Sequence, residues 1–268
     1  MKLRKNNRDQ GPKEADRQVD TVARAIEILN CFTVERPELS LKELSEMTGL
    51  YKSRILRLCG TLVAHRYLTR LPGASGYGLG SRLLVLGKIY ERTNTLASLA
   101  RPILRDLARN TGESASLFVI EGLKRLCLAR EEGPSAIRYS ILEGQTLELY
   151  AGAGGKVLLA YSPKEMVDQV LSRIDLKKLT DATITDRDRL EKTFATIRRQ
   201  GYGESLGERL AEAAALAAPV FDHTGKVHAV LTLAGPIQRF SAKRRRAMTD
   251  ELKAAAHKLS VQLGYQTD

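Results

Sequence analysis

The 268-residue sequence lacks tryptophan, and it contains few cysteines, few histidines and no long uninterrupted apolar run. Its cysteines, Cys31, Cys59 and Cys127, lie far apart and match neither a CxxC pair nor a zinc-ligand spacing, which indicates free buried thiols in a reducing cytoplasm. A membrane-spanning helix needs about 18 apolar residues in a row, so no membrane partner is expected. The four histidines have no carboxylate or cysteine at ligand spacing, so we predict no metal and no cofactor.

Signatures of catalysis are also missing. No nucleophile stands beside a candidate base, and no GxGxxG fingerprint with a downstream acid is present. The stretch YAGAGGKVLLAY at residues 150–161 invites comparison with a phosphate-binding loop, but Val157 stands where that loop needs Ser or Thr, and Tyr150 stands where it needs glycine. These departures argue against nucleotide hydrolysis and predict that the protein is not an enzyme.

Positive charge is abundant and uneven along the chain. The net charge is +12, and residues 1–92 hold 17 Lys and Arg against 10 Asp and Glu. Residues 1–18 have no apolar core, so they predict a disordered basic arm rather than a secretory signal. A basic N-terminal third fits a nucleic-acid surface, although a generally basic protein would show the same excess.

Residues 19–81 predict three short helices followed by a hairpin. In the first helix, Val22, Ile26, Leu29 and Phe32 share one face. The second helix, after Pro37, begins with a capping box formed by Ser40 and Glu43 and ends at Gly49, which can adopt a positive φ. The third helix is KSRILRLCGTLVAH, and the segment YLTRLPGASGYGLG predicts a two-stranded wing around a Pro-Gly-Ser turn.

Two helices joined through a glycine turn, the second opening with basic and hydroxyl residues, are typical of a helix-turn-helix. The major groove admits one helix, whose first residues meet base edges, and arginine can pair bidentately with guanine. The residues expected to contact DNA are Tyr51, Lys52, Ser53, Arg54, Arg57 and Arg70. The alternative is a small helical interaction module on which these side chains form a solvated face.

Residues 82–96 open a long helical pattern, SRLLVLGKIYERTNTLASLARPILRDLARNTG, with a break expected at Thr93–Thr95 or at Pro102. We interpret its first part as a linker helix that joins two domains and pairs with a second copy of the chain, because one winged helix reads only half of an operator. Packing within the chain is the alternative.

The remaining residues, 97–268, alternate short strands with helices. SASLFVIEG, RLCLAREE and IRYSILEG predict an antiparallel set, the DHTG turn predicts a later hairpin, and the second half of LAEAAALAA is expected to be strand. Gly154 and Gly155 let the backbone N–H groups of a helix start approach a small carboxylate, which the helix dipole favours. A tight turn without a ligand explains these glycines equally well.

The order RAIEIL, LSLKELSEMTGLYKSRILRLCGTL, YLTR and YGLGSRLLVLG resembles the winged helix-turn-helix of the IclR family of bacterial transcriptional regulators. The segments AGAGGKVLLA, TITDRDRLEKTFATIRRQGYG and GERLAEAAALAAPVFDHTGKVHAVLTLAGP resemble the second half of that family. Two positions depart from the family pattern: Arg66 replaces a glycine before the wing, and Gly78 replaces an arginine within it.

The resemblance implies that residues 97–268 form a GAF-like effector-binding domain. Carried over by position, the residues expected at its pocket are Leu142, Ala153, Gly154, Gly155, Ser205, Glu208, Ala213, Ala215 and Thr232. The alanines of LAEAAALAA replace a glycine of the family pattern, which suggests a larger or more apolar cavity.

The sequence therefore predicts an α+β protein with an N-terminal winged helix-turn-helix, a linker helix, and a C-terminal GAF-like domain whose antiparallel sheet is flanked by helices. The expected function is cytoplasmic regulation of transcription, in which a dimer or dimer of dimers binds a double-stranded DNA operator under the control of a small organic acid effector. The alternative is a metabolite-binding protein or enzyme with an N-terminal docking module.

Overall fold

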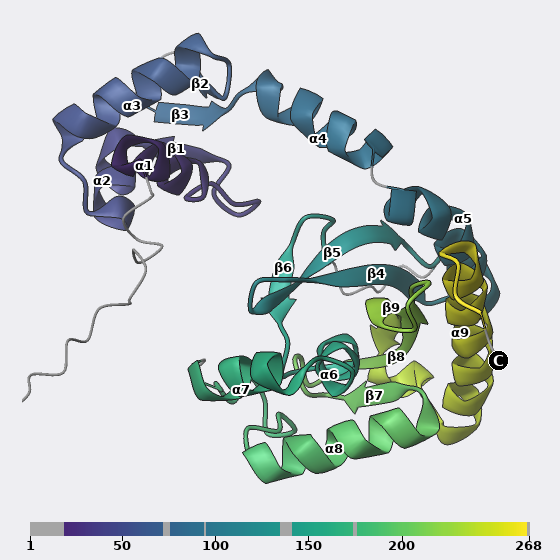
Figure 1. Ribbon diagram of the computed structural model, residues 1–268. Coiled ribbons are helices and arrows are strands. Elements are labelled where there is room, and N and C mark those ends of the chain that lie inside the picture. The colour runs from purple at the N-terminus through teal and green to yellow at the C-terminus, as the bar shows by residue number, and fades with distance from the viewer. Residues whose placement is uncertain (1–18, 72–75, 94, 135–140, 174–175, 267–268) are drawn as a thin grey trace, which may run out of the picture. The chain divides into compact units, whose positions relative to one another are not determined.

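The computed structural model describes the chain except for residues 1–18, 72–75, 94, 135–140, 174–175 and 267–268 (Figure 1). The chain forms two compact units, Met1–Thr93 and Asn94–Asp268, which are described separately below. The predicted basic arm lies outside the described residues. Within the described part, no helix is both long and apolar enough to cross a membrane.

The first unit combines a bundle of three helices, a small sheet and a fourth helix that follows them. It contains α1 (Asp20–Leu29), β1 (Glu38–Ser40), α2 (Leu41–Thr48), α3 (Lys52–Ala64), β2 (Leu68–Arg70), β3 (Gly76–Leu79) and α4 (Ser81–Thr93). The strands are antiparallel in the order β1-β3-β2, so the predicted wing is present as β2 and β3. Its core includes Ile28, Leu44, Ile55, Cys59 and Tyr77.

Local signals explain the turn between α2 and α3. The Ser40 side chain accepts a hydrogen bond from the Glu43 backbone N–H, and the Glu43 side chain accepts one from the Ser40 backbone N–H, so the predicted capping box is confirmed. Gly49 has a φ of 68°, in the left-handed region where glycine carries no steric cost. With these two features, only three residues separate the end of α2 from the start of α3.

The predicted apolar face of α1 is wrong by part of a turn. Ile28 is fully buried, whereas Val22 and Ile26 are 55% and 51% exposed. The buried side follows Ala25, Ile28, Leu29 and Phe32, which have the same i, i+3, i+4, i+7 spacing as a helical stripe. Apolar residues lie on both sides of this short helix, so spacing alone could not select the buried one.

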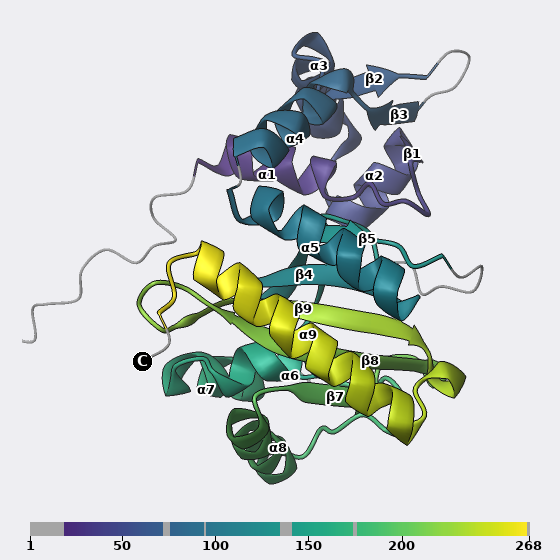
Figure 2. The same ribbon diagram turned by 90° about the vertical axis from the view of Figure 1, so that its right-hand side faces the viewer.

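The second unit is a six-stranded antiparallel sheet between two helical layers. The strand order is β6-β5-β4-β9-β8-β7, with β4 (Ser114–Glu121), β5 (Lys124–Glu131), β6 (Thr146–Glu148), β7 (Gly203–Leu206), β8 (Ala213–Phe221) and β9 (Val227–Pro236). One face packs on α5 (Thr95–Thr111) and α9 (Ala242–Gln262); the other packs on α6 (Ala153–Ala160), α7 (Lys164–Arg173) and α8 (Arg187–Gln200) (Figure 2). A short 3-10 helix, η2 (Ile237–Arg239), precedes α9.

Most expected elements of this unit are present. The turn at residues 222–225 joins β8 to β9, and β8 begins at Ala213, as expected for the second half of LAEAAALAA. Helix α4 ends at Thr93 and α5 begins at Thr95, whereas Pro102 lies inside α5 without ending it. The predicted linker, residues 82–96, thus corresponds to α4 and the first residues of α5.

The third predicted strand is misplaced. IRYSILEG begins at residue 137, partly outside the described residues, and its residues 141–144 are not strand. The strand that pairs with β5 is β6, at Thr146–Glu148. Gly144 has a φ of 83°, so the turn that was expected to follow the strand precedes it instead.

Candidate functional site

The first turns of α3 present a basic, exposed surface. Lys52, Ser53 and Arg57 are exposed, and Tyr51, the N-cap residue, is 85% exposed. Ser53, Arg54 and Arg57 line one open hollow along the helix. The first turn contains no acidic side chain, so its positive dipole end is uncompensated and suits an anion such as a phosphate. Arg70 is exposed on β2 of the wing.

Arg54 has a partner that the sequence did not suggest. Its guanidinium forms an ion pair with the Asp20 carboxylate of α1, and Arg24 also contacts Asp20 at 3.2 Å. The hydrogen bond from Arg54 holds the pKa of Asp20 below its usual value. Both partners are substantially solvent-exposed, so the pair contributes little to stability, and an incoming anion can displace it.

The wing begins at a residue with unusual backbone geometry. Helix α3 ends at Ala64, and Arg66 has a φ of 62°, the left-handed conformation that usually falls to glycine. The backbone N–H groups of Arg66 and Tyr67 donate to carbonyls of Val63 and Leu62, so the turn closes despite the side chain. Arg66 therefore holds, at a steric cost, a backbone conformation that glycine adopts freely.

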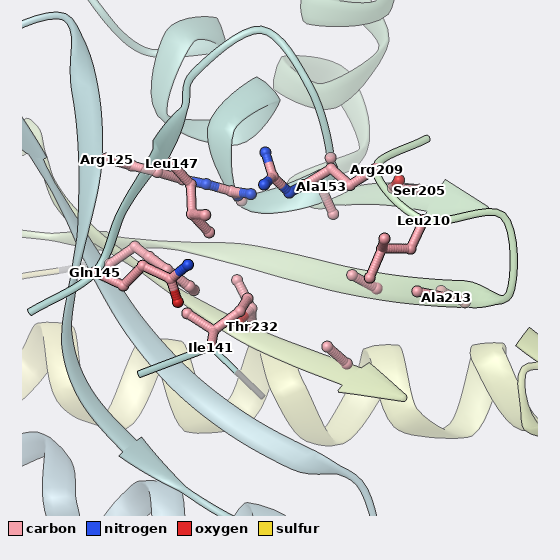
Figure 3. Close-up of a pocket in the computed structure, with 16 residues that line it drawn as sticks. Arg125, Ile141, Gln145, Leu147, Ala153, Ser205, Arg209, Leu210, Ala213 and Thr232 are labelled. Atoms are coloured by element: carbon pink, nitrogen blue, oxygen red, sulfur yellow. The ribbon is translucent and has the colours of Figure 1, made fainter. Parts of the chain in front are cut away.

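The second unit contains a cavity of about 220 Å³ between the sheet and the start of α6 (Figure 3). Six of the nine residues expected at the pocket line it: Ala153, Gly154, Ser205, Ala213, Ala215 and Thr232. They come from α6, β7, β8 and β9, which shows how distant segments converge there. Ile141, Gln145 and Leu147 close the side formed by β6 and the turn before it.

Three expected pocket residues do not line this cavity. Leu142 is 45% exposed, whereas its neighbour Ile141 faces the cavity, which reflects the displaced turn before β6. A side chain at Gly155 would lie 2.3 Å from the Leu149 carbonyl oxygen, so this glycine permits close backbone packing rather than ligand access. Glu208 instead forms an ion pair with Lys156 beside the turn that precedes α6.

That ion pair involves the lysine of the glycine-rich stretch. Lys156 is 2% exposed, and its ammonium group pairs with the Glu208 carboxylate and donates to the Glu204 carbonyl at 3.1 Å. Glu208 in turn accepts a hydrogen bond of 3.1 Å from the Gly152 backbone N–H. Lys156 therefore stabilises the turn before α6 through its ion pair with Glu208. A lysine of a phosphate-binding loop would instead contact the phosphate of a ligand.

Two arginines that sequence reasoning missed define the polar end of the cavity. Figure 3 shows the Arg125 and Arg209 side chains reaching toward each other there. Arg209 pairs with Glu148, and although burial opposes ionisation, this hydrogen bond keeps the pKa of Glu148 below its usual value. Burial and the nearby charge of Arg209 lower the pKa of Arg125 to about 9. The sequence held one signal for Arg125: it lies two residues before the apolar Cys127 on one strand, so both side chains are on the same, buried face.

Glycines at the N-cap and in the first turn of α6 make room for these arginines. Gly152 has a φ of 82°, and a side chain there would lie 3.0 Å from Cδ of Arg209. A side chain at Gly154 would lie 2.6 Å from Nη1 of Arg125. The glycine-rich stretch thus admits two guanidinium groups to the cavity wall. Among the described residues, no group of three or more His, Cys, Asp and Glu side chains could hold a metal ion.

The comparisons with known proteins cover both units. Residues 21–72 match the IclR helix-turn-helix domain, and residues 90–261 match the model described as bacterial transcriptional regulator IclR C-terminal. The chain is 30% identical to the HTH-type transcriptional regulator KipR of Bacillus subtilis over 91% of this chain and 97% of KipR. It is also 30% identical to the HTH-type transcriptional regulator BhcR of Paracoccus denitrificans over 100% and 98% of the two chains.

Solved structures agree with these relatives. An IclR regulator from Alicyclobacillus acidocaldarius superposes with a TM-score of 0.84 at 28% identity, covering 92% of this chain and 100% of the other. An IclR homolog from Microbacterium hydrocarbonoxydans, complexed with 4-hydroxybenzoate, gives 0.80 at 26% identity, covering 91% and 98%. With family models matching both units, the chain belongs to the IclR family of DNA-binding transcriptional regulators and is not an enzyme.

Proposed function

We propose that this chain is an effector-controlled regulator whose affinity for a DNA operator changes when a small organic acid occupies the cavity beside α6. The observation that carries the proposal is the cavity itself, which combines apolar walls with a cationic end in a domain of a DNA-binding protein. Ligand control requires only that the acid binds two conformations of the protein with different affinities. The relative bound to 4-hydroxybenzoate supports an organic acid as the ligand class.

DNA contact is assigned to Tyr51, Lys52, Ser53, Arg54, Arg57 and Arg70. Arg54 would read a base edge, because it lies in the first turn of α3, whereas Lys52 and Arg70 would contact phosphates. A second copy of the chain would supply the other half-site. Exposed apolar side chains on α1 (Val22 and Ile26) and on α4 (Leu84 and Ile89) support this self-association, since such faces are seldom left in water.

The test is fluorescence anisotropy with labelled DNA from upstream of the protein's own gene, measured with and without a panel of small carboxylic acids. We expect sequence-preferring binding that one acid strengthens or weakens at least fivefold, as coupling of about 1 kcal/mol would give. Arg54→Ala should lose specific binding far more than nonspecific binding. The proposal that a ligand controls DNA binding is wrong if an acid binds the protein, as seen by thermal shift, but leaves operator affinity unchanged.

A further inference from the structure

Arg125 is a buried cation, and no described carboxylate lies at hydrogen-bond distance from it. It is 4% exposed, and its Nε finds no hydrogen-bond partner among the described residues. Its guanidinium carbon lies 4.9 Å from the centre of the Phe118 ring, a cation–π contact that satisfies none of its N–H groups. Glu148 and Glu208 stabilise this charge electrostatically without a hydrogen bond to it. Buried polar groups normally make hydrogen bonds, which suggests that the hydrogen-bond partner of Arg125 arrives with the ligand.

The other charges beside the cavity are already neutralised. Arg209 pairs with Glu148, and Lys156 pairs with Glu208. Arg125 therefore leaves an excess of one positive charge among the described groups around this site. A ligand with a single negative charge balances that excess, whereas a ligand with two would leave one negative charge buried and unpaired.

The rest of the cavity wall suits a compact apolar body. Phe118, Leu147, Leu210 and the first alanines of β8 contribute apolar side chains to it, Ser205 and Thr232 add hydroxyl groups, and Gln145 adds an amide. The volume of about 220 Å³ lies below the usual range of about 300–1,000 Å³ for drug-sized ligands, so the ligand must be small. The first turn of α6 lies at the same end as Arg125, and its dipole favours negative charge there.

We propose that Arg125 is the charge anchor of this cavity and that its ligand is a small monocarboxylate with an apolar body. The carboxylate meets the N–H edge of Arg125, and the apolar body lies along β8 and Leu147. This assignment rests on the proposed function for its regulatory meaning, but the binding it describes is tested independently of DNA.

The experiment is a thermal-shift titration of the full chain at constant ionic strength with three matched sets of probes. Acetate and benzoate carry one charge, acetamide and benzamide are their neutral counterparts, and malonate and phthalate carry two charges. The variant is Arg125→Gln, and the control is Lys124→Gln, which removes an exposed charge from the neighbouring position of the same strand. Arg125→Lys keeps a charge without the planar N–H edge.

We expect a monocarboxylate to stabilise the wild-type chain at concentrations at least tenfold lower than its amide or its dicarboxylate counterpart. Arg125→Gln should weaken that binding at least tenfold, Arg125→Lys should weaken it less, and Lys124→Gln should leave it unchanged. Far-UV circular dichroism and a cooperative thermal transition of each ligand-free variant verify that it is folded. The proposal is overturned if no monocarboxylate stabilises the wild type, if amides or dicarboxylates bind as well, or if a folded Arg125→Gln variant keeps wild-type affinity.

Failure of the proposed function gives a different result. If a monocarboxylate binds through Arg125 while operator affinity stays constant, the anchor stands and ligand control of DNA binding does not. If an acid changes operator affinity equally in the wild type and in Arg125→Gln, ligand control stands and the anchor does not.

Discussion

Lys156→Met should strongly destabilise the second unit, because it breaks a buried ion pair on one side only. The side chains of Lys156 and Glu208 are 3% and 7% exposed. This places the pair among buried ion pairs, where removal of one partner costs about 3–5 kcal/mol, rather than among exposed pairs worth at most about 1 kcal/mol. The substitution also removes the hydrogen bond from Lys156 to the Glu204 carbonyl. We therefore expect a loss of about 4 kcal/mol in the free energy of unfolding.

The assay is urea unfolding of the full chain followed by far-UV circular dichroism, with thermal unfolding as a second measure. A loss of about 4 kcal/mol corresponds to a melting temperature lower by roughly 8–16 °C for a domain of this size. Lys164→Met, at an exposed position, is the matched control and should change stability by less than about 0.5 kcal/mol. Glu208→Gln in the Lys156→Met background removes the stranded charge while keeping an acceptor for the Gly152 N–H, so it should recover more than half of the loss. A single-variant loss below about 1 kcal/mol would refute the reasoning.

Three further predictions test the remaining charges and the strained turn. Arg125→Met should raise the ligand-free melting temperature by about 4–8 °C in differential scanning calorimetry, since replacing a buried charge by an apolar side chain gains about 2 kcal/mol; an unchanged or lower value contradicts an uncompensated charge there. Arg66→Gly should stabilise the first unit by about 0.5–1 kcal/mol in thermal unfolding, because it relieves the positive φ. The control is His65→Gly, at a φ of −95°, which should destabilise the unit. If both substitutions changed stability in the same direction, Arg66 would not be strained. Asp20→Asn should tighten operator binding up to about fivefold, as measured by anisotropy, because it releases Arg54. The control is Glu27→Gln, which also removes one negative charge but from a residue that pairs with Arg24, and it should have a smaller effect.

Local sequence signals predicted the first unit well because its geometry is set by neighbouring residues. Ser40 and Glu43 are three residues apart and cap α2 whatever surrounds them. Gly49 can take its left-handed conformation without tertiary support. The face of α1 was mispredicted because it depends on what packs against the helix, and apolar residues were available on both sides.

The charges of the cavity could not be predicted in the same way. Lys156 meets Glu208 across 52 positions of sequence, and Arg209 meets Glu148 across 61. Neither pairing has a local pattern, because β6 and β7 lie at opposite edges of the six-stranded sheet and the paired side chains meet only through tertiary packing. The resemblance to the family predicted Glu208 as a pocket residue that faces the ligand. In the structure its carboxylate pairs with Lys156 instead.

The glycine-rich stretch would therefore act on the proposed ligand indirectly, through the side chains that it accommodates. In a phosphate-binding loop, glycines expose backbone N–H groups, and the affinity for several negative charges is built into the loop. Here Gly152 and Gly154 give space to Arg209 and Arg125, and Gly155 gives space to the Leu149 backbone. The charge presented to the ligand thus belongs to two side chains, one of which Glu148 already neutralises. If the cavity binds the proposed ligand, a single substitution at Arg125 or Glu148 would change the ligand charge that it accepts by one unit.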